Sequence, residues 1–271
     1  MIDAHVHLWR IGHNDCRWPG PDLPAIHRDF AVGDLLAQLD AHGVDRAILV
    51  QSQESQVDTR WLLDVAANEA RIAGVVGWVD LTAADAPVCL DRLMQAGPLV
   101  GIRPMVQERG DDWYDDPRLE PALADMVRHG LVLEALVRPR HLPALARLAA
   151  RWPDLTIMVD HCAKPEPDGF ADWARAMRTL AAHPHVACKL SGLLTQLPAG
   201  ASPADAQPWI DLVVDAFGAA RLVWGSDWPV LTLAASYGDW HGQALDAIGD
   251  SDRPAIFAAN AARLYRLDSA A

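Results

Sequence analysis

Ile2-Asp3-Ala4-His5-Val6-His7-Leu8-Trp9 opens the chain, and this stretch decides between two kinds of α/β fold. The apolar run predicts a β-strand over residues 2–7, in which alternate side chains face the same way. A doubly wound sheet would continue such a strand into a glycine-rich first turn. This strand ends instead in His7-Leu8-Trp9, which favours a (β/α)8 barrel if the rest of the chain supplies the other units.

His5 and His7 project from one face of the predicted strand, and Ala4 and Val6 take the other face. Two imidazoles on one rigid strand can clamp a metal ion or bind one substrate oxygen together. Such a pair also occurs on surface strands and on N-terminal tails, so the remaining sequence has to decide between these interpretations.

Apolar runs of strand length occur eight times and alternate with amphipathic helical stretches. The predicted strands are residues 2–7, 46–51, 73–79, 99–105, 131–137, 156–161, 186–191 and 222–226. The predicted helices are residues 32–42, with Gly43 at the C-terminal cap, and 59–70, 84–96, 117–129, 141–151, 171–183, 203–217, 234–248 and 254–265. Strands that are apolar on both faces and joined by helices indicate a covered parallel sheet. Eight such units predict a (β/α)8 TIM barrel, with residues 1–271 as a single domain.

The composition excludes several classes of protein. The 271 residues carry 23 Lys and Arg against 36 Asp and Glu, a formal charge of −13, and an acidic chain without a basic run disfavours nucleic acid and anionic membranes as partners. No apolar run has the length of a membrane-spanning helix, and Met1-Ile2-Asp3 opens with neither a basic n-region nor an apolar h-region, so we expect no signal peptide. The four cysteines are scattered, so we expect reduced thiols in a cytoplasmic protein, either a monomer or a homodimer.

Polar side chains stand at or near the carboxyl ends of nearly all the predicted strands. They are His5, His7, Gln51, Gln53, Trp78, Asp80, Arg103, Glu134, His161, Lys189, Ser191 and Asp227. Catalytic residues of a (β/α)8 barrel come from these ends. Buried charges are costly unless they pair, coordinate or take part in chemistry, so their common position predicts a convergent site.

Each of these residues also has a structural interpretation. The two glutamines are able to cap helices, and Arg103, Glu134 and Lys189 are able to form a buried ion group without chemistry. Asp160 alternates with His161, so we expect it to point away from the site and to play a supporting part. Closure of the barrel, however, sets the eighth strand beside the first, where Asp227 faces the His5–His7 pair.

Three imidazoles and a carboxylate support two kinds of chemistry. They can hold Zn²⁺ with an activated water. Without a metal, the histidines can polarise a carbonyl oxygen while Asp227 takes a proton from the attacking water. Both routes lead to hydrolysis or a related attack on a carbonyl. The sequence has no Gly-x-Ser-x-Gly, no phosphate-binding glycine loop and no dinucleotide fingerprint.

Four motifs resemble one family. Asp-Ala-His-Val-His at 3–7, Val-Asp-His-Cys-Ala-Lys-Pro at 159–165, Lys-Leu-Ser-Gly at 189–192 and Trp-Gly-Ser-Asp-Trp-Pro at 224–229 are similar to the lactonase branch of the amidohydrolase superfamily. This branch includes lactonases of L-fuconolactone, L-rhamnonolactone and 2-pyrone-4,6-dicarboxylate. The resemblance implies that His5, His7 and His161 bind a metal or the lactone carbonyl. It implies that Asp227 activates water and later protonates the leaving alkoxide.

The sequence departs from the dinuclear members of the superfamily in two places. Arg103 stands on the strand where those members carry a carboxylated lysine, and Glu134 stands where many carry a histidine. A dinuclear centre is therefore disfavoured. A single Zn²⁺, bound by His5, His7 and Asp227 with Glu134 or His161 as an addition, and a metal-free site both stay open.

The expected reaction is hydrolysis of a sugar-acid lactone, resembling L-fuconolactone, to the free acid. Residues interpreted as binding the substrate are Gln51, Gln53, Arg103, Glu134 and Lys189, with Trp78, Trp113, Tyr114 and Trp228 as walls and His27 on the long 8–31 loop. A dicarboxylate lactone would call for several arginines, and Arg103 is the clear one on a strand. The same scaffold also fits a metal-dependent amidase or decarboxylase and, outside enzymes, a ligand-binding barrel.

Overall fold

The computed structural model describes residues 1–267. Eight parallel strands pair in chain order: β1 (Ile2–Val6), β2 (Arg46–Val50), β3 (Ile72–Gly77), β4 (Leu99–Ile102), β5 (Val132–Ala135), β6 (Ile157–Val159), β7 (Val186–Leu190) and β8 (Leu222–Trp224). Two backbone hydrogen bonds join β1 to the segment after β8. The His7 N–H donates to the Trp228 carbonyl and the Asp227 N–H to the His5 carbonyl, each at 2.8 Å. These bonds bring the eighth unit beside the first and confirm the predicted (β/α)8 barrel.

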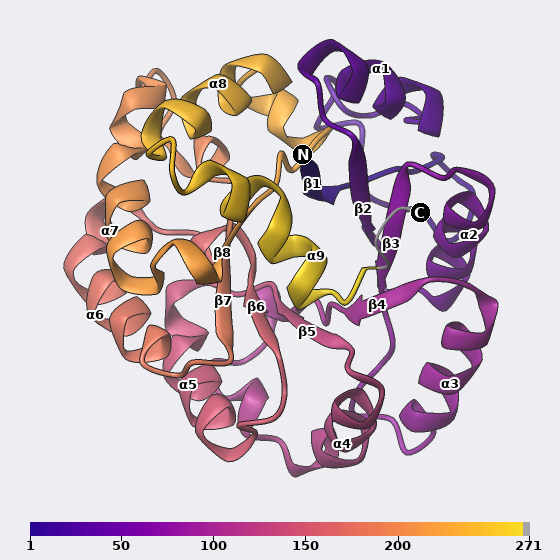
Figure 1. Ribbon diagram of the computed structural model, residues 1–271. Coiled ribbons are helices and arrows are strands. Elements are labelled where there is room, and N and C mark those ends of the chain that lie inside the picture. The colour runs from indigo at the N-terminus through magenta and orange to yellow at the C-terminus, as the bar shows by residue number, and fades with distance from the viewer. Residues whose placement is uncertain (268–271) are drawn as a thin grey trace.

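Helices surround the strands as an outer ring (Figure 1). They are α1 (Val32–His42), α2 (Gln56–Asn68), α3 (Ala86–Ala96), α4 (Glu120–His129), α5 (Leu142–Arg151), α6 (Phe170–Ala181), α7 (Gln207–Phe217) and α8 (Tyr237–Ala247). Helix α1 buries Leu35 and Leu39, and it ends at Gly43, whose φ of 64° is the left-handed conformation that glycine adopts without strain.

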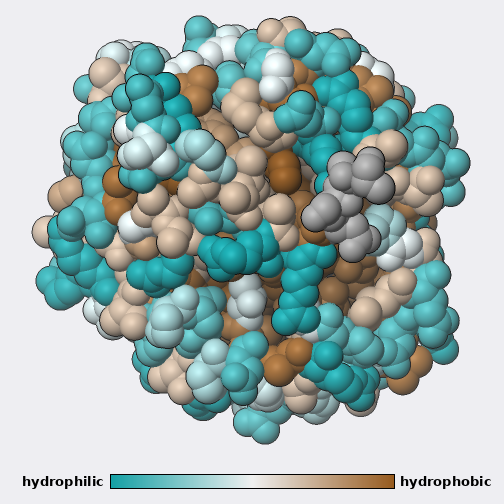
Figure 2. Space-filling model, viewed as in Figure 1, coloured by the Kyte–Doolittle hydropathy of each residue, from teal (hydrophilic) through white to brown (hydrophobic). Residues whose placement is uncertain are grey.

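The last predicted helix closes one end of the barrel. It is a π-helical turn, Ala255–Ala259, followed by α9 (Asn260–Leu264), and α9 lies across the ring of strands in Figure 1. Ala261 and Tyr265 pack with Ile2, Ala4 and other inward-facing strand residues in one apolar cluster. Figure 2 shows side chains filling the middle of the ring from this side. This end is the amino end of the strands, so a ligand site has to lie at the opposite, carboxyl end.

The sixth strand ends earlier than its apolar run predicts. β6 ends at Val159, and a 3-10 turn, Asp160–Ala163, follows. His161, Cys162, Ala163 and Lys164 all have φ near +50°, a conformation that side chains other than glycine seldom adopt. Such strain persists only where the surrounding structure enforces it, and it often marks a functional segment.

No helix within residues 1–267 is both long and apolar enough to cross a membrane. Cys16, Cys89, Cys162 and Cys188 are all free thiols.

Candidate active site

Four side chains from distant parts of the chain meet at the carboxyl end of the barrel. The Nε2 atoms of His5 and His7 lie 3.2 Å apart. The Oδ1 atom of Asp227 lies 3.8 Å from Nε2 of His5, 3.3 Å from that of His7 and 3.9 Å from that of His161. The histidines and the aspartate predicted from the sequence therefore gather around one carboxylate oxygen.

Local backbone geometry brings the four side chains together. The pairing of β1 with β2 shifts register between Asp3 and Val6, and irregularities of this kind re-aim side chains next to active sites. Ala4 consequently packs inside the barrel and Val6 in the outer core, so the expectation that they share a face is wrong. Asp227, with φ of 60°, lies in the left-handed region, where aspartate is more common than most residues.

A cavity of about 310 Å³ opens above these groups. It is lined by His7, Trp18, Ser52, Arg103, Met105, Gln107, Leu136, His161, Lys164, Asp227 and Val230. His5 is fully buried and lies beneath the cavity rather than on its wall. The cavity is of a size that takes one small polar molecule, with the Asp227 carboxylate at its base.

The charge states follow from burial. Burial lowers the pKa of His161 to about 4, and it lowers the pKa of His7 as well. The pKa of His5 is lowered well below its usual range by burial and by the charge of Lys189. Burial would raise the pKa of Asp227, but the imidazoles, His161 first, outweigh this effect and hold it below its ordinary value. At neutral pH the site holds neutral imidazoles and an ionised carboxylate.

The hydrogen bonds assign one tautomer. Nδ1 of His7 lies 2.7 Å from the Val50 carbonyl, which can only accept, so Nδ1 carries the proton. Nε2 of the neutral ring therefore presents its lone pair to the Asp227 carboxylate 3.3 Å away. Two acceptors this close repel each other unless a proton or a cation lies between them.

This arrangement fits a metal ion. Ligand atoms of His5, His7 and Asp227 all lie within 4.8 Å of one another and all three residues are buried. Two imidazole nitrogens and a carboxylate oxygen, with His161 alongside, form a donor set typical of Zn²⁺. The fold thus places the three residues predicted first as metal ligands around a single point, and Glu134, the possible addition, is not in this group.

A layer of buried charge lies under the histidines. The Lys189 ammonium is 2.6 Å from Glu134 and 3.3 Å from Asp160, and its Nζ donates to Nδ1 of His5 at 3.2 Å. The Tyr265 hydroxyl donates to Glu134 from below. Glu134 and Lys189 are fully buried, so they stand in the barrel interior instead of on the cavity wall.

The orientation of Asp160 differs from the one that the sequence predicts. Its carboxylate faces inward, 3.6 Å from Nδ1 of His5 and 3.6 Å from Arg103, and not toward the opposite side from His161. Strand alternation fails here because the chain has already left β6 for the left-handed turn. Burial would raise the pKa of Asp160, but Lys189 and His5 lower it well below its ordinary value, so the buried carboxylate is charged.

Two glutamines and an arginine fix the loops around the cavity. The Gln51 side chain donates to the Arg103 carbonyl at 2.9 Å, and Arg103 donates back to the Gln51 carbonyl. Another Arg103 nitrogen, Nη1, is 3.3 Å from Nε2 of His5. Gln53 accepts from the backbone of Arg17 and donates to that of Trp18 at 2.7 Å, which anchors the long 8–31 loop.

The predicted aromatic walls lie elsewhere. Trp78 and Trp113 line a neighbouring cavity, and Tyr114 is buried, with 1% of its surface exposed. Trp228 is buried against Phe30, 5.2 Å between ring centroids. His27 hydrogen-bonds the Pro19 carbonyl at 2.9 Å within its own loop. The tryptophan that lines the cavity above His7 and Asp227, called the catalytic cavity below for its proposed role, is Trp18, which is 37% exposed.

Three residues near the site have no role predicted from the sequence. Ser191 lies 2.9 Å from Nδ1 of His161 and fixes the ring. Asp3 accepts from the Ser226 N–H at 2.8 Å and from the Tyr237 hydroxyl at 2.9 Å, tying β1 to the loop that carries Asp227. The sequence signal for Asp3 is a carboxylate inside an apolar strand.

Gly192 is the third. Its φ is 62°, and a Cβ on it would lie 2.5 Å from Nδ1 of His161. We expect Gly192→Ala to lower kcat/KM by about 100-fold, since displacing a catalytic group by about 1 Å has an effect of that order. Gly200→Ala is the control, because Gly200 also has positive φ, 83°, but nothing lies within 4 Å of its Cβ position. Steady-state kinetics and thermal unfolding of both variants would test this, and equal losses of activity would contradict it.

Several known proteins are similar to this chain in sequence and in fold. The family model described as Amidohydrolase matches residues 2–267. An L-fucono-1,5-lactonase of Burkholderia ambifaria is 47% identical over 277 residues, covering 98% of this chain and 96% of the relative. An L-fucono-1,5-lactonase of Burkholderia multivorans is 35% identical with the same coverage. The crystal structure of an amidohydrolase from Burkholderia multivorans with bound zinc superimposes with a TM-score of 0.91 at 34% identity, covering 98% of this chain and 99% of that one. The chain therefore belongs to the amidohydrolase family.

Proposed function

We propose that the protein hydrolyses the lactone of a sugar acid, of the L-fuconolactone type, to the free acid. The observation that carries the proposal is the Asp227 carboxylate, 3.3–3.9 Å from the Nε2 atoms of three histidines at the base of a cavity of about 310 Å³. The proposal is supported by two relatives, 47% and 35% identical, that are named L-fucono-1,5-lactonases.

Asp227 acts on the attacking water. Its carboxylate accepts a proton from the water as the water oxygen bonds to the lactone carbonyl carbon. Collapse of the tetrahedral intermediate breaks the bond between that carbon and the ring oxygen. The protonated Asp227 then returns its proton to the ring oxygen as it leaves as an alkoxide, so the carboxylate is regenerated and the product is the open-chain acid.

His161 and Arg103 act on the carbonyl oxygen. With the Ser191 hydroxyl donating to Nδ1 of His161, the Nε2–H of that ring faces the cavity. Arg103 brings guanidinium donors to the same space, fixed by its bonds with Gln51. Donors aimed at the position where negative charge develops stabilise the tetrahedral intermediate.

A single Zn²⁺ is the cofactor that we propose for this site. His5, His7 and Asp227 would hold it, and a related amidohydrolase has been solved with bound zinc. When bound, the ion supplies a Lewis acid that polarises a carbonyl oxygen. The Asp160 carboxylate, 3.6 Å from Nδ1 of His5, would then accept the Nδ1–H and orient that ring, in the way that carboxylates beyond the ligands commonly fix metal-binding histidines.

A lactone-opening assay with a pH indicator tests the proposal. We expect the pure protein to open 1,5- and 1,4-lactones of six-carbon sugar acids and to leave a pyrone dicarboxylate unchanged. Parallel reactions with and without a chelator, and metal analysis of the same preparation, report whether bound zinc contributes. Opening of every lactone at the spontaneous rate would refute the proposed function.

A further inference from the structure

We propose that a second cavity, beside the catalytic one, binds a neutral pyranose ring. The cavity has a volume of about 470 Å³ and lies among the loops that follow β2, β3 and β4. It is therefore at the carboxyl end of the barrel, where ligands of this fold bind. The proposal rests on the proposed function only where the ring is taken to be part of the lactone substrate.

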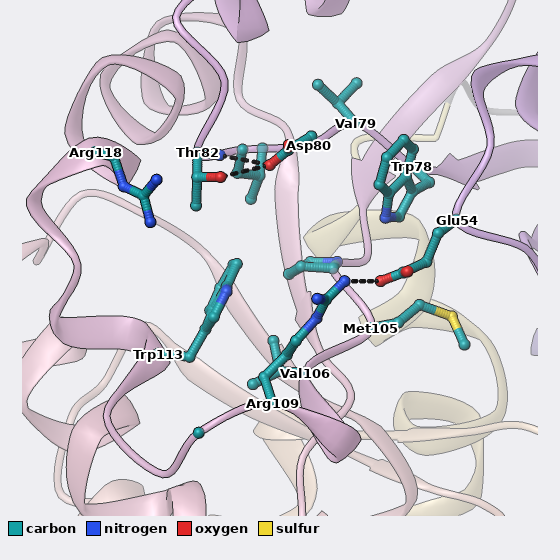
Figure 3. A pocket seen from close by; sticks show the side chains of 13 residues that line it. Glu54, Trp78, Val79, Asp80, Thr82, Met105, Val106, Arg109, Trp113 and Arg118 are labelled. Carbon is teal, nitrogen blue, oxygen red and sulfur yellow. Dashed lines mark hydrogen bonds and ion pairs between the residues drawn. The ribbon is translucent and has the colours of Figure 1, made fainter.

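Two indoles form opposite walls. Figure 3 shows Trp78 and Trp113 on either side of the cavity, with the Arg109 side chain between them in this view. Both indoles are partly exposed, although the protein buries most of its other large aromatic side chains. A flat apolar face with a polar edge suits a sugar ring, which has C–H groups on its faces and hydroxyls around its rim.

The charges in the cavity favour a neutral ligand. The Arg109 guanidinium is paired with Glu54 at 2.7 Å, and that of Arg118 with Asp116 at 2.6 Å. Each arginine therefore already has its carboxylate, so an anion would have to displace one of them. Thr82 and Asp80, joined at 2.7 Å, add a further donor and acceptor. Each arginine–carboxylate pair keeps N–H donors and oxygen acceptors that the pair itself does not use. These positions can hydrogen-bond to the hydroxyl groups of a sugar.

The two cavities are neighbours. Met105 lines both of them, and adjacent residues of the β4 loop, Arg103 and Pro104, line one each. The β2 loop likewise gives Ser52 to the catalytic cavity and Glu54 to the second. A ring in the second cavity would thus lie next to a lactone over Asp227. The ring would come either from a glycosyl substituent on the lactone or from a separate sugar.

Two measurements distinguish these sources. Saturation-transfer NMR with methyl β-galactopyranoside detects a separate sugar without using the reaction. Kinetics with the lactone of a galactosyl-substituted hexonic acid, against a monosaccharide lactone, detects the substituent. The variants are Trp113→Ala and Trp78→Ala. Phe170→Ala is the control, because Phe170 is an exposed aromatic residue on α6 that lines neither cavity.

We expect Trp113→Ala to raise the KM of the galactosyl lactone at least about tenfold more than that of the monosaccharide lactone, or to weaken glycoside binding about tenfold. Either result supports the site, and Phe170→Ala should give neither. If Trp113→Ala fails to fold, Trp78→Ala carries the same expectation. Turnover of the monosaccharide lactone with no glycoside binding and no preference for the galactosyl lactone would overturn the inference. Glycoside binding without any lactone turnover would keep the site and refute the proposed function.

Discussion

Replacing Asp227 with asparagine is expected to lower kcat/KM for the best lactone by about 100- to 10,000-fold, the contribution of a general base. The variant removes the ionised carboxylate that lines the cavity, whereas burial lowers the pKa values of His7 and His161 and makes them weaker bases. Asparagine has nearly the same shape, and it tolerates the positive φ of 60° at this position. The loss should therefore be chemical and not structural.

Three observations would establish that point. Circular dichroism and thermal unfolding of Asp227→Asn should match the wild type. Asp246→Asn, which removes an exposed carboxylate from α8, should keep full activity. A residual activity of Asp227→Asn within about tenfold of the wild type would contradict a role in activating water, because a positioned base contributes more than that.

The barrel could be predicted from the sequence because the same pattern of strand and helix occurs eight times along the chain. Eight apolar runs separated by amphipathic stretches give eight independent signals, and an error of two residues in any of them leaves the topology unchanged. Helix α1 begins and ends where its pattern predicts, since Gly43 fixes its end locally. β6 does not, because the apolar run continues into a turn whose left-handed backbone depends on contacts with distant residues.

In the candidate site, too, some positions could be predicted from the sequence and others could not. The strand order places His5, His7, His161 and Asp227 at one end of the barrel, so it was enough to predict their proximity, but not the local backbone geometry that orients them. The positions of Trp78 and Trp113 depend on the paths of loops, which carry no periodic signal, and these residues line the second cavity instead. Asp160 faces inward for a similar reason, because alternation holds only as far as the strand continues.

The charged side chains buried inside the barrel are unfavourable for stability, but they contact His5. Lys189, Glu134 and Asp160 have no exposed side-chain surface, and one ammonium serves two carboxylates. Burial and the charge of Asp160 raise the pKa of Glu134 to about 7, against the opposing effect of Lys189. A group of this kind is a poor source of net stability, although removing one member leaves the others without compensation. Its position under His5 indicates that it is retained to orient that ring.

Replacing Lys189 with methionine should therefore destabilise the protein by about 3–5 kcal/mol, the usual cost of breaking a buried pair from one side. Methionine fills a similar volume but leaves Glu134 without its cation and Asp160 with only Arg103, 3.6 Å away. It also leaves Nδ1 of His5 without its donor, so kcat should fall in whatever fraction stays folded. Urea unfolding at pH 7, with kinetics of the same samples, measures both effects.

Two further variants show whether the loss of stability in Lys189→Met comes from the buried carboxylates. Arg175→Met breaks an ion pair whose side chains are 74% and 83% exposed, and it should change the free energy of unfolding by less than about 1 kcal/mol. Adding Glu134→Gln to Lys189→Met should recover part of the lost stability, because it removes a carboxylate that no longer has a partner. A Lys189→Met protein as stable as Arg175→Met would mean that the buried carboxylates take up protons at little cost. In that case the charged layer could not be what fixes His5, and the orientation of that ring would have to come from Arg103 and His7 alone.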